Sequence, residues 1–142
     1  MHHSLQLRIV TPSRLLFDDE VREVTAPGAV GEIGVLPDHV TFLTTLDIGA
    51  MSFRTDQGVR RLAVRGGFAE VADNVMTVLA DDAAFPQDID VVGARADLQA
   101  AEAQLEKLSP VDDAYTSAEA NRRWAIARIE AAGAAPELTR TA

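Results

Sequence analysis

The stretch that decides the fold is residues 66–80, which read GGFAEVADNVMTVLA. Gly66 and Gly67 mark a bend or bulge, because glycine adopts backbone conformations that other residues resist. Two strand-like runs, 68–71 and 75–80, follow the glycines and are separated by the turn residues Asp73 and Asn74. The stretch therefore predicts a bend and then two strands joined by a tight turn.

The residues before this stretch predict further short strands. Leu5, Leu7 and Ile9 alternate with polar residues, which is the period of a half-buried strand. Other strand-like runs are 15–17, 21–26, 40–46, 48–53 and 60–64, divided by turn signals at 11–13, 27–28 and 55–58. Many short strands at this spacing predict an all-β antiparallel sandwich or barrel, which we place in residues 1–86.

The composition changes near Pro86, after which alanine, leucine, glutamine, glutamate and arginine dominate. Asp88 is expected to cap a first helix, and Ser109-Pro110 to end it. Its apolar positions are spaced four, three, four and three residues apart: Ala94, Leu98, Ala101, Leu105 and Leu108.

A second helix is expected to start at Asp112 or Asp113 and to run to about Gly133. Its small and apolar positions are Ala118, Ala125, Ile129 and Ala132. Residues 87–142 are therefore predicted to form an antiparallel helical hairpin with a frayed tail. An alanine methyl contributes about 1 kcal/mol on burial, against roughly 1.5–3 for leucine, so this hairpin should be only marginally stable alone.

Composition and charge exclude several classes of function. The chain has 142 residues, a net charge of −9 and no cysteine. An acidic surface repels phosphate backbones, so we expect no nucleic acid partner. Without cysteine, and with two of three histidines at the extreme N-terminus, no zinc site is expected. No apolar run approaches the roughly 20 residues that span a bilayer, so we expect no direct membrane insertion.

Catalytic residues are hard to assemble from this sequence. His39 beside Asp38, with Ser52 or Thr44 as a nucleophile, would mimic a hydrolase triad. A loop histidine that bonds the backbone is the favoured interpretation. The single lysine, Lys107, lies in a predicted helix, which excludes a phosphate-binding P-loop.

A cation site is a further alternative, at Asp81 and Asp82. A solvated charge pair at the end of a strand is the favoured interpretation. We therefore predict no catalytic residue, no metal ligand and no cofactor, and we expect that the chain is not an enzyme.

Residues 28–39 read GAVGEIGVLPDH and place three glycines three residues apart. A phosphate-binding loop should be followed by a helix, whereas a strand-like run follows here. Backbone turns that need a positive φ are the favoured explanation of these glycines.

The same segment resembles the G-x-x-G-x-x-G-[VI]-L-P-x-H signature of the epsilon subunit of F-type, proton-translocating ATP synthase. Residues 66–80 are similar to that family's G-G-F-x-x-V-x-x-N-x-V-x-V-L-A run, with a one-residue difference in how valine falls after Asn74. The opening LRIVTP, residues 7–12, is similar to the family's first strand and turn. The resemblance covers the chain from Leu5 to about Ala132, with two long motifs in the right order.

This resemblance implies a non-catalytic subunit of the rotating central stalk, which couples proton-driven rotation to ATP synthesis. Its sandwich would bind the gamma subunit and the ring of c subunits. Its helices, when extended along gamma, would contact the alpha and beta subunits and inhibit ATP hydrolysis. The resemblance places such a subunit peripherally, at the cytoplasmic face of the bacterial plasma membrane.

Candidate partner-binding residues follow from this role. An exposed apolar patch on the sandwich would include Phe42, Leu43, Leu46 and Met51. The alternative, that these residues fill the core, stays open because the sequence does not sort the two faces.

In the family, basic residues of the last helix face acidic loops of the catalytic subunits. The matching residues here are Arg122, Arg123 and Arg128. The alternative is that they pair across the hairpin with Asp97, Glu102 and Glu106.

Two departures from the family pattern bear on function. Some members bind ATP through an [IL]-D-x-x-R-A motif, but here Ile89-Asp90 is followed by Gly93 in place of the arginine. We therefore expect weak or absent ATP binding. Thr41 stands where the family commonly has proline, which affects local loop detail. A second hypothesis of a different class is a free-standing regulatory domain that responds to a nucleotide.

Overall fold

The computed structural model describes residues 1–134. The frayed tail that the sequence predicts after Gly133 falls on residues 135–142, which lie outside the described part. The elements are β1 (Leu5–Val10), β2 (Leu15–Val21), β3 (Glu23–Gly28), β4 (Gly31–Val35), β5 (Phe42–Thr55), β6 (Gly58–Ala72), β7 (Val75–Ala80), β8 (Ala83–Ala84), the short 3-10 helix η1 (Pro86–Asp88), α1 (Val91–Lys107) and α2 (Asp113–Ala131).

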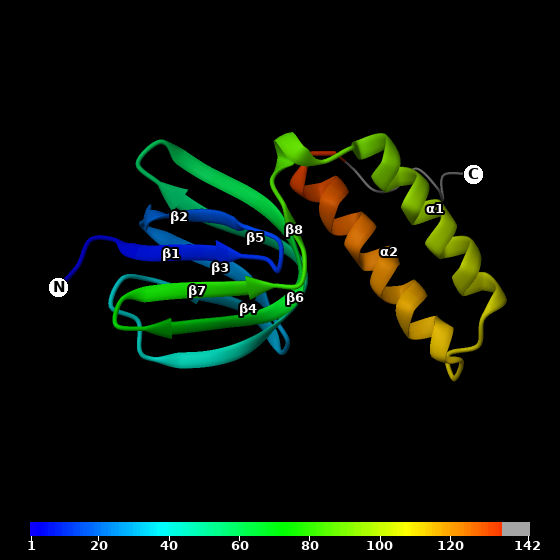
Figure 1. Cartoon of the computed structure of the whole chain (residues 1–142), viewed down its shortest axis with the longest axis horizontal. Coiled ribbons are helices and arrows are strands. Elements are labelled where there is room, and N and C mark those ends of the chain that lie inside the picture. Colours follow the sequence, from blue (N-terminus) through cyan, green and yellow to red (C-terminus); the bar gives the residue numbers. More distant parts are fainter. Residues whose placement is uncertain (135–142) are drawn as a thin grey trace.

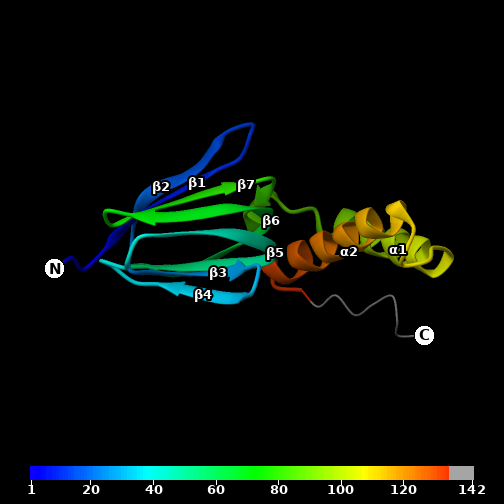
Figure 2. The same cartoon turned by 90° about the horizontal axis from the view of Figure 1, so that it is seen from below.

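The strands form a two-layered sandwich, and the two helices lie side by side at one end of it (Figure 1). In sheet order the strands run β2-β1-β7-β6-β5-β3-β4, and β8 pairs with β6. Figure 2 shows β2, β1 and β7 in one layer and β3 and β4 in the other. The long hairpin of β5 and β6 takes part in both layers. Residues 67–72 of β6 pair with β7, while Leu46 and residues 52–54 of β5 pair with β3. The predicted β-sandwich followed by a helical hairpin is confirmed.

Several details differ from the prediction. The runs 40–46 and 48–53 belong to one strand, β5, and 60–64 and 68–71 to one strand, β6. Residues 31–35, expected only as turns, form β4, which pairs with β3. All strand pairs are antiparallel except β1 and β7, which are parallel and are separated along the chain by five intervening strands. Helix α1 begins later than expected, with Asp90 rather than Asp88 as its N-cap.

The bend of β6 depends on two glycines. Leu46 pairs with Gly67 and Ile48 with Arg65, so the ladder between β5 and β6 is interrupted at Asp47 and Gly66. Gly66 and Gly67 have φ angles of 68° and 107°, which side chains disfavour. A Cβ atom at Gly67 would lie 2.0 Å from the carbonyl oxygen of Leu79. The close approach of β7 therefore excludes any side chain at position 67.

Three hydrophobic clusters hold the fold together. The largest fills the sandwich and includes Leu7, Ile9, Met51, Phe53 and Val71. The second joins α2 to the sandwich, and the third joins the two helices. The second consists of Ala63, Trp124, Ala127 and Ala131, with Ile48 and Ile89 packed against it. The third consists of Ala94, Leu98, Ala125 and Ile129. The helices thus rest on the sandwich mainly through alanine and one tryptophan.

We expect Gly67→Ala to destabilise the chain by about 3 kcal/mol or more, because it adds backbone strain and a clash with β7. Gly58→Ala is the matched control, since its φ of 124° is also positive but its Cβ would meet nothing within 4 Å. Urea unfolding should show a much smaller loss for the control. Equal losses in the two variants would contradict the role of the close approach.

Candidate functional site

An apolar stripe crosses the outer face of the layer that contains β2, β1 and β7. Val10 pairs with Leu15 on one side and with Leu79 on the other, and Leu79 pairs with Phe68. Leu15, Leu79 and Phe68 are each about half exposed, at 51%, 52% and 51%. We call these four residues the outer stripe. Side chains placed opposite one another on neighbouring strands lie close together, so the stripe is continuous.

The four apolar residues proposed from the sequence divide between surface and core. Leu43 is 67% exposed, and it lies on the same face as the outer stripe because it pairs with Glu70, two residues from Phe68. Phe42 is half-buried against the core. Leu46 and Met51 are buried, so for these two the alternative interpretation, that they fill the core, is the one the structure supports.

Sequence reasoning missed the outer stripe, although a signal was present. In the runs 68–71 and 75–80 both alternating sets contain apolar residues, so Phe68 and Leu79 occupy positions where an ordinary half-exposed strand would carry polar residues. Apolar residues on the solvent side of a strand indicate a surface that is covered in an assembly.

The loop between β4 and β5 exposes two further apolar side chains, Leu36 and Val40. His39 in this loop bonds the backbone carbonyl of Val40 and lies 5.1 Å from the ring of Phe42. Within residues 1–134, no hydrogen bond joins His39 to Asp38, Ser52 or Thr44. The hydrolase triad is therefore not assembled in the described structure.

Asp38 instead bonds the N-terminus of the chain. The backbone N–H and the imidazole of His2 bond its carboxylate and hold the pKa of Asp38 below its ordinary value. Its own backbone N–H donates to Asn74, whose side chain donates to the carbonyl of Ser4. These contacts fix the loop that presents Leu36 and Val40.

The structure does not support a cation-binding site at Asp81 and Asp82. Asp82 accepts a hydrogen bond from the backbone of Ala83. No cluster of three or more ligating side chains suited to a metal ion occurs in the described residues.

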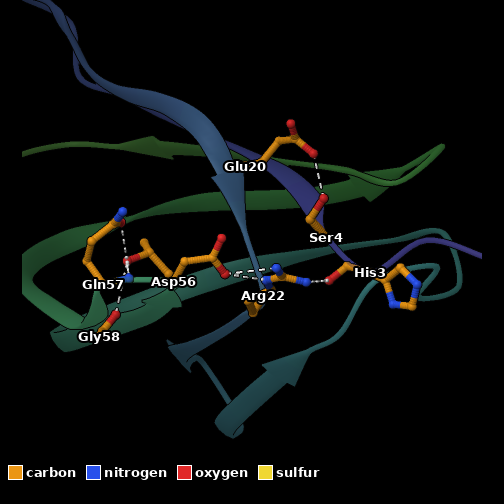
Figure 3. Close-up of polar contacts among 8 residues, drawn as sticks. His3, Ser4, Glu20, Arg22, Asp56, Gln57 and Gly58 are labelled. Carbon is orange, nitrogen blue, oxygen red and sulfur yellow. Dashed lines mark hydrogen bonds and ion pairs between the residues drawn. The ribbon is translucent and has the colours of Figure 1, made fainter.

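A cavity of about 590 Å³ opens between β2 and the β5–β6 hairpin. Figure 3 shows that the polar groups around it bond one another. Arg22 pairs with Asp56 at 2.8 Å and also donates to the carbonyl of His3, while Ser4 donates to Glu20. These pairs hold the edge of the sandwich together, while the guanidinium of Arg60, which also lines the cavity, lies over the ring of Phe85.

Helix α2 is attached to the sandwich by polar contacts as well as by packing. Arg123 contacts Asp47 at 2.8 Å and the carbonyl of Ile48 at 3.4 Å. Arg65 of β6 donates to the side chain of Asn121 at 2.8 Å. The Arg123 guanidinium holds the pKa of Asp47 below its ordinary value, and Asp47 raises the pKa of Arg123 in turn.

The other two candidate arginines have partners within the hairpin. Arg128 pairs with Asp97 of α1 at 3.1 Å and lies over the ring of Trp124. Arg122 pairs with Glu119 on its own helix. In this conformation Arg128 therefore makes the cross-hairpin pair with Asp97, whereas Arg123 contacts the sandwich.

The N-terminus of α1 bears on nucleotide binding. Asp90 accepts a hydrogen bond from the backbone of Gly93, and a Cβ atom at Gly93 would lie 2.6 Å from the Asp90 carboxylate. Gly93 thus allows Asp90 to cap the helix closely, and it supplies no guanidinium for a phosphate.

None of the helices in the described part of the chain is long and apolar enough to cross a membrane.

We expect isothermal titration calorimetry to detect no micromolar binding of ATP to the isolated chain, because the arginine of the nucleotide motif is missing at Gly93. A micromolar dissociation constant would contradict this expectation.

We expect Asp47→Asn to lower the stability of the chain at neutral pH by less than about 1 kcal/mol, because the pair with Arg123 is partly exposed. The folded chain lowers the pKa of Asp47, so the stabilisation is complete above the ordinary value of about 3.9 and is lost as pH falls through the lower folded value. The difference between wild type and variant in urea unfolding, followed by Trp124 fluorescence, should therefore shrink below about pH 4. Glu70→Gln is the control, because Glu70 is exposed on β6 and forms no hydrogen bond or ion pair through its side chain within the described residues. A difference that stays constant down to strong acid would contradict the assignment.

Comparison with known proteins agrees with the two-part architecture. Residues 4–86 match the family described as ATP synthase, Delta/Epsilon chain, beta-sandwich domain, and residues 87–133 match the corresponding long alpha-helix domain. The chain is 41% identical over 133 residues to ATP synthase epsilon chain 2 of Syntrophotalea carbinolica, covering 94% of this chain and 96% of that relative. It is 42% identical over 135 residues to the ATP synthase epsilon chain of Geobacter sulfurreducens, covering 95% and 98%.

Solved structures share the fold. A chain of the Euglena gracilis mitochondrial ATP synthase superposes with a TM-score of 0.77 at 24% identity, covering 93% of this chain and 82% of that one. A chain of the Tetrahymena thermophila mitochondrial ATP synthase superposes with a TM-score of 0.61 at 18% identity, covering 89% and 95%. With both family domains matched in order and near-complete coverage by relatives above 40% identity, the chain belongs to the ATP synthase delta/epsilon chain family.

Proposed function

We propose that this chain is the non-catalytic epsilon subunit of an F-type ATP synthase, located in the central stalk, where it couples rotation of the proton-driven rotor to ATP synthesis. Membership of the delta/epsilon family supports this role. The observation that carries it is the outer stripe, a continuous apolar surface on an otherwise acidic chain. An apolar strip of this kind is typical of a surface that another protein covers.

The sandwich has two surfaces for two partners. The outer stripe, extended by Leu43, is proposed to bind the gamma subunit, because a sheet face offers a broad surface to an elongated partner. The loop that exposes Leu36 and Val40 is proposed to contact the ring of c subunits. The contacts of Asp38 and Asn74 keep this loop in place, which reduces the entropy lost on binding.

The division into residues 1–86 and 87–142 is proposed to be functional, with the hairpin as an element that detaches from the sandwich and inhibits ATP hydrolysis. The packing between them is made largely of alanine, and its polar contacts are partly exposed. Both features keep the free energy of separation small. Once extended, the hairpin would present Arg122, Arg123 and Arg128 to the alpha and beta subunits.

Such a subunit is peripheral to the membrane and reaches it through the rotor ring. For a bacterial enzyme we propose the cytoplasmic face of the inner membrane as its location. The bacterial origin of the relatives supports this proposal.

The test is reconstitution with a catalytic head that contains gamma and lacks epsilon. Phe68→Glu and Leu79→Glu should each weaken binding of the chain by about thirtyfold or more, since a charge at the centre of an apolar interface removes about 2 kcal/mol. Val59→Glu is the matched control, because Val59 is similarly exposed but lies outside the stripe. Equal binding of all three variants would contradict the assignment of the stripe.

The same preparation tests the role of the hairpin. ATP hydrolysis should fall when the full chain is added, and a chain that ends at Pro86 should bind without inhibiting. Inhibition by both forms would contradict the proposed role of the helices. Failure of the full chain to bind any cognate head would contradict the proposed function itself.

A further inference from the structure

A cavity of about 350 Å³ lies where β6, α1 and α2 meet. Arg65 reaches it from β6, Asp97 and Gln104 from α1, and Asn121, Trp124 and Arg128 from α2. This cavity is separate from the outer stripe and from the contact of Arg123 with Asp47. Neither Asp90 nor Gly93 of the degraded nucleotide motif lines it, although Arg128 belongs to the second helix, whose arginines contribute to the nucleotide site in the family.

Two guanidinium groups face this cavity, but only one has a carboxylate partner. Arg128 pairs with Asp97, whose side chain is 61% exposed. Arg65 is half-buried and donates to the neutral amide oxygen of Asn121, and within residues 1–134 it forms no ion pair. The lining side chains therefore carry a net positive charge, although the chain as a whole is acidic.

Further residues that carry N–H groups line the same cavity. Trp124 lines the cavity and its indole N–H forms no hydrogen bond within the described residues, and the side chains of Gln104 and Asn121 add amide donors. Guanidinium groups that converge with neutral N–H donors form strong, directed hydrogen bonds to oxyanions, above all to phosphate. Carboxylate is the weaker candidate, because a planar group with two oxygens engages fewer donors that come from three elements.

We propose that this cavity is a binding site for a phosphate group, occupied by free inorganic phosphate. A nucleotide fits less well, because Trp124 is only 7% exposed and Arg128 lies over its ring, which leaves no open aromatic face for a base. Phosphate here would bridge β6 to both helices and would add contacts between the hairpin and the sandwich. The proposal stands independently of the assignment to the central stalk.

The chain contains a single tryptophan, which gives a direct probe of the cavity. Titration of the ¹⁵N-labelled full chain with sodium phosphate should shift the one indole N–H resonance of Trp124 along a saturable curve. Sodium chloride at matched ionic strength should produce no saturable shift. A shift that is linear in phosphate, or equal to that in chloride, would overturn the proposal.

Variants separate a specific site from general charge. Arg65→Gln should weaken phosphate binding about tenfold or more, because it removes a charged donor, and Arg65→Lys should restore part of the affinity. Arg54→Gln is the control, since Arg54 pairs with Glu23 on the distant β3. Unchanged affinity in Arg65→Gln, with the fold intact by circular dichroism, would overturn the assignment.

A second titration, with ATP, distinguishes the source of the phosphate group. ATP should bind no more tightly than inorganic phosphate. Tenfold tighter binding of ATP that is lost in Arg65→Gln would overturn the assignment to free phosphate and identify a nucleotide site instead.

Discussion

At Gly67 the backbone of β6 passes so close to β7 that a Cβ atom would lie 2.0 Å from the carbonyl oxygen of Leu79. This close approach, with the positive φ angles of Gly66 and Gly67, lets β6 leave one layer of the sandwich and continue in the other. On the N-terminal side of the bend, Ala63 and Val64 pair with β8, and Ala63 packs against α2. The strand β6 therefore contributes to two surfaces. Phe68, after the bend, belongs to the outer stripe, and Ala63, before the bend, packs against α2.

The free energy that holds the helical hairpin against the sandwich is modest. Ala63, Ala127 and Ala131 bury little area each, and Trp124 is the one large side chain in the cluster. The polar contacts Arg123 to Asp47 and Arg65 to Asn121 are partly exposed, so each contributes about 1 kcal/mol or less. The sandwich, in contrast, is filled by branched, aromatic and sulfur-containing side chains. The junction is therefore a weaker contact than the packing inside the sandwich.

The sequence was sufficient to predict the types of elements, because Gly66-Gly67, the alternation at 5–9 and the spacing of four and three in α1 are local signals. It was not sufficient to assign the faces of the strands. Leu43 and Met51 belong to the same alternating set of β5, so periodicity would place them on one face. The ladder is interrupted at Asp47, and after this interruption Met51 faces the core while Leu43 before it is exposed. The parallel pairing of β1 with β7 and the contact of Arg123 with Asp47 join residues far apart in the chain. Such pairings depend on the tertiary fold and leave no local pattern.

If the hairpin detached from the sandwich as proposed, the three candidate arginines would respond differently. Arg122 pairs with Glu119 on the same helix, so its contact survives any motion of α2. Arg128 pairs with Asp97 across the hairpin, and this contact survives if the two helices leave the sandwich as one body. Of the three, only Arg123 contacts the sandwich. If both helices left the sandwich as one body, Arg123 would lose its partner Asp47, and its charge would become available to another partner. Departure would also separate Arg65 from Asn121 and divide the cavity between them. An anion in that cavity would therefore oppose detachment, whereas an acidic partner for Arg123 would favour it, because each binds one state better than the other.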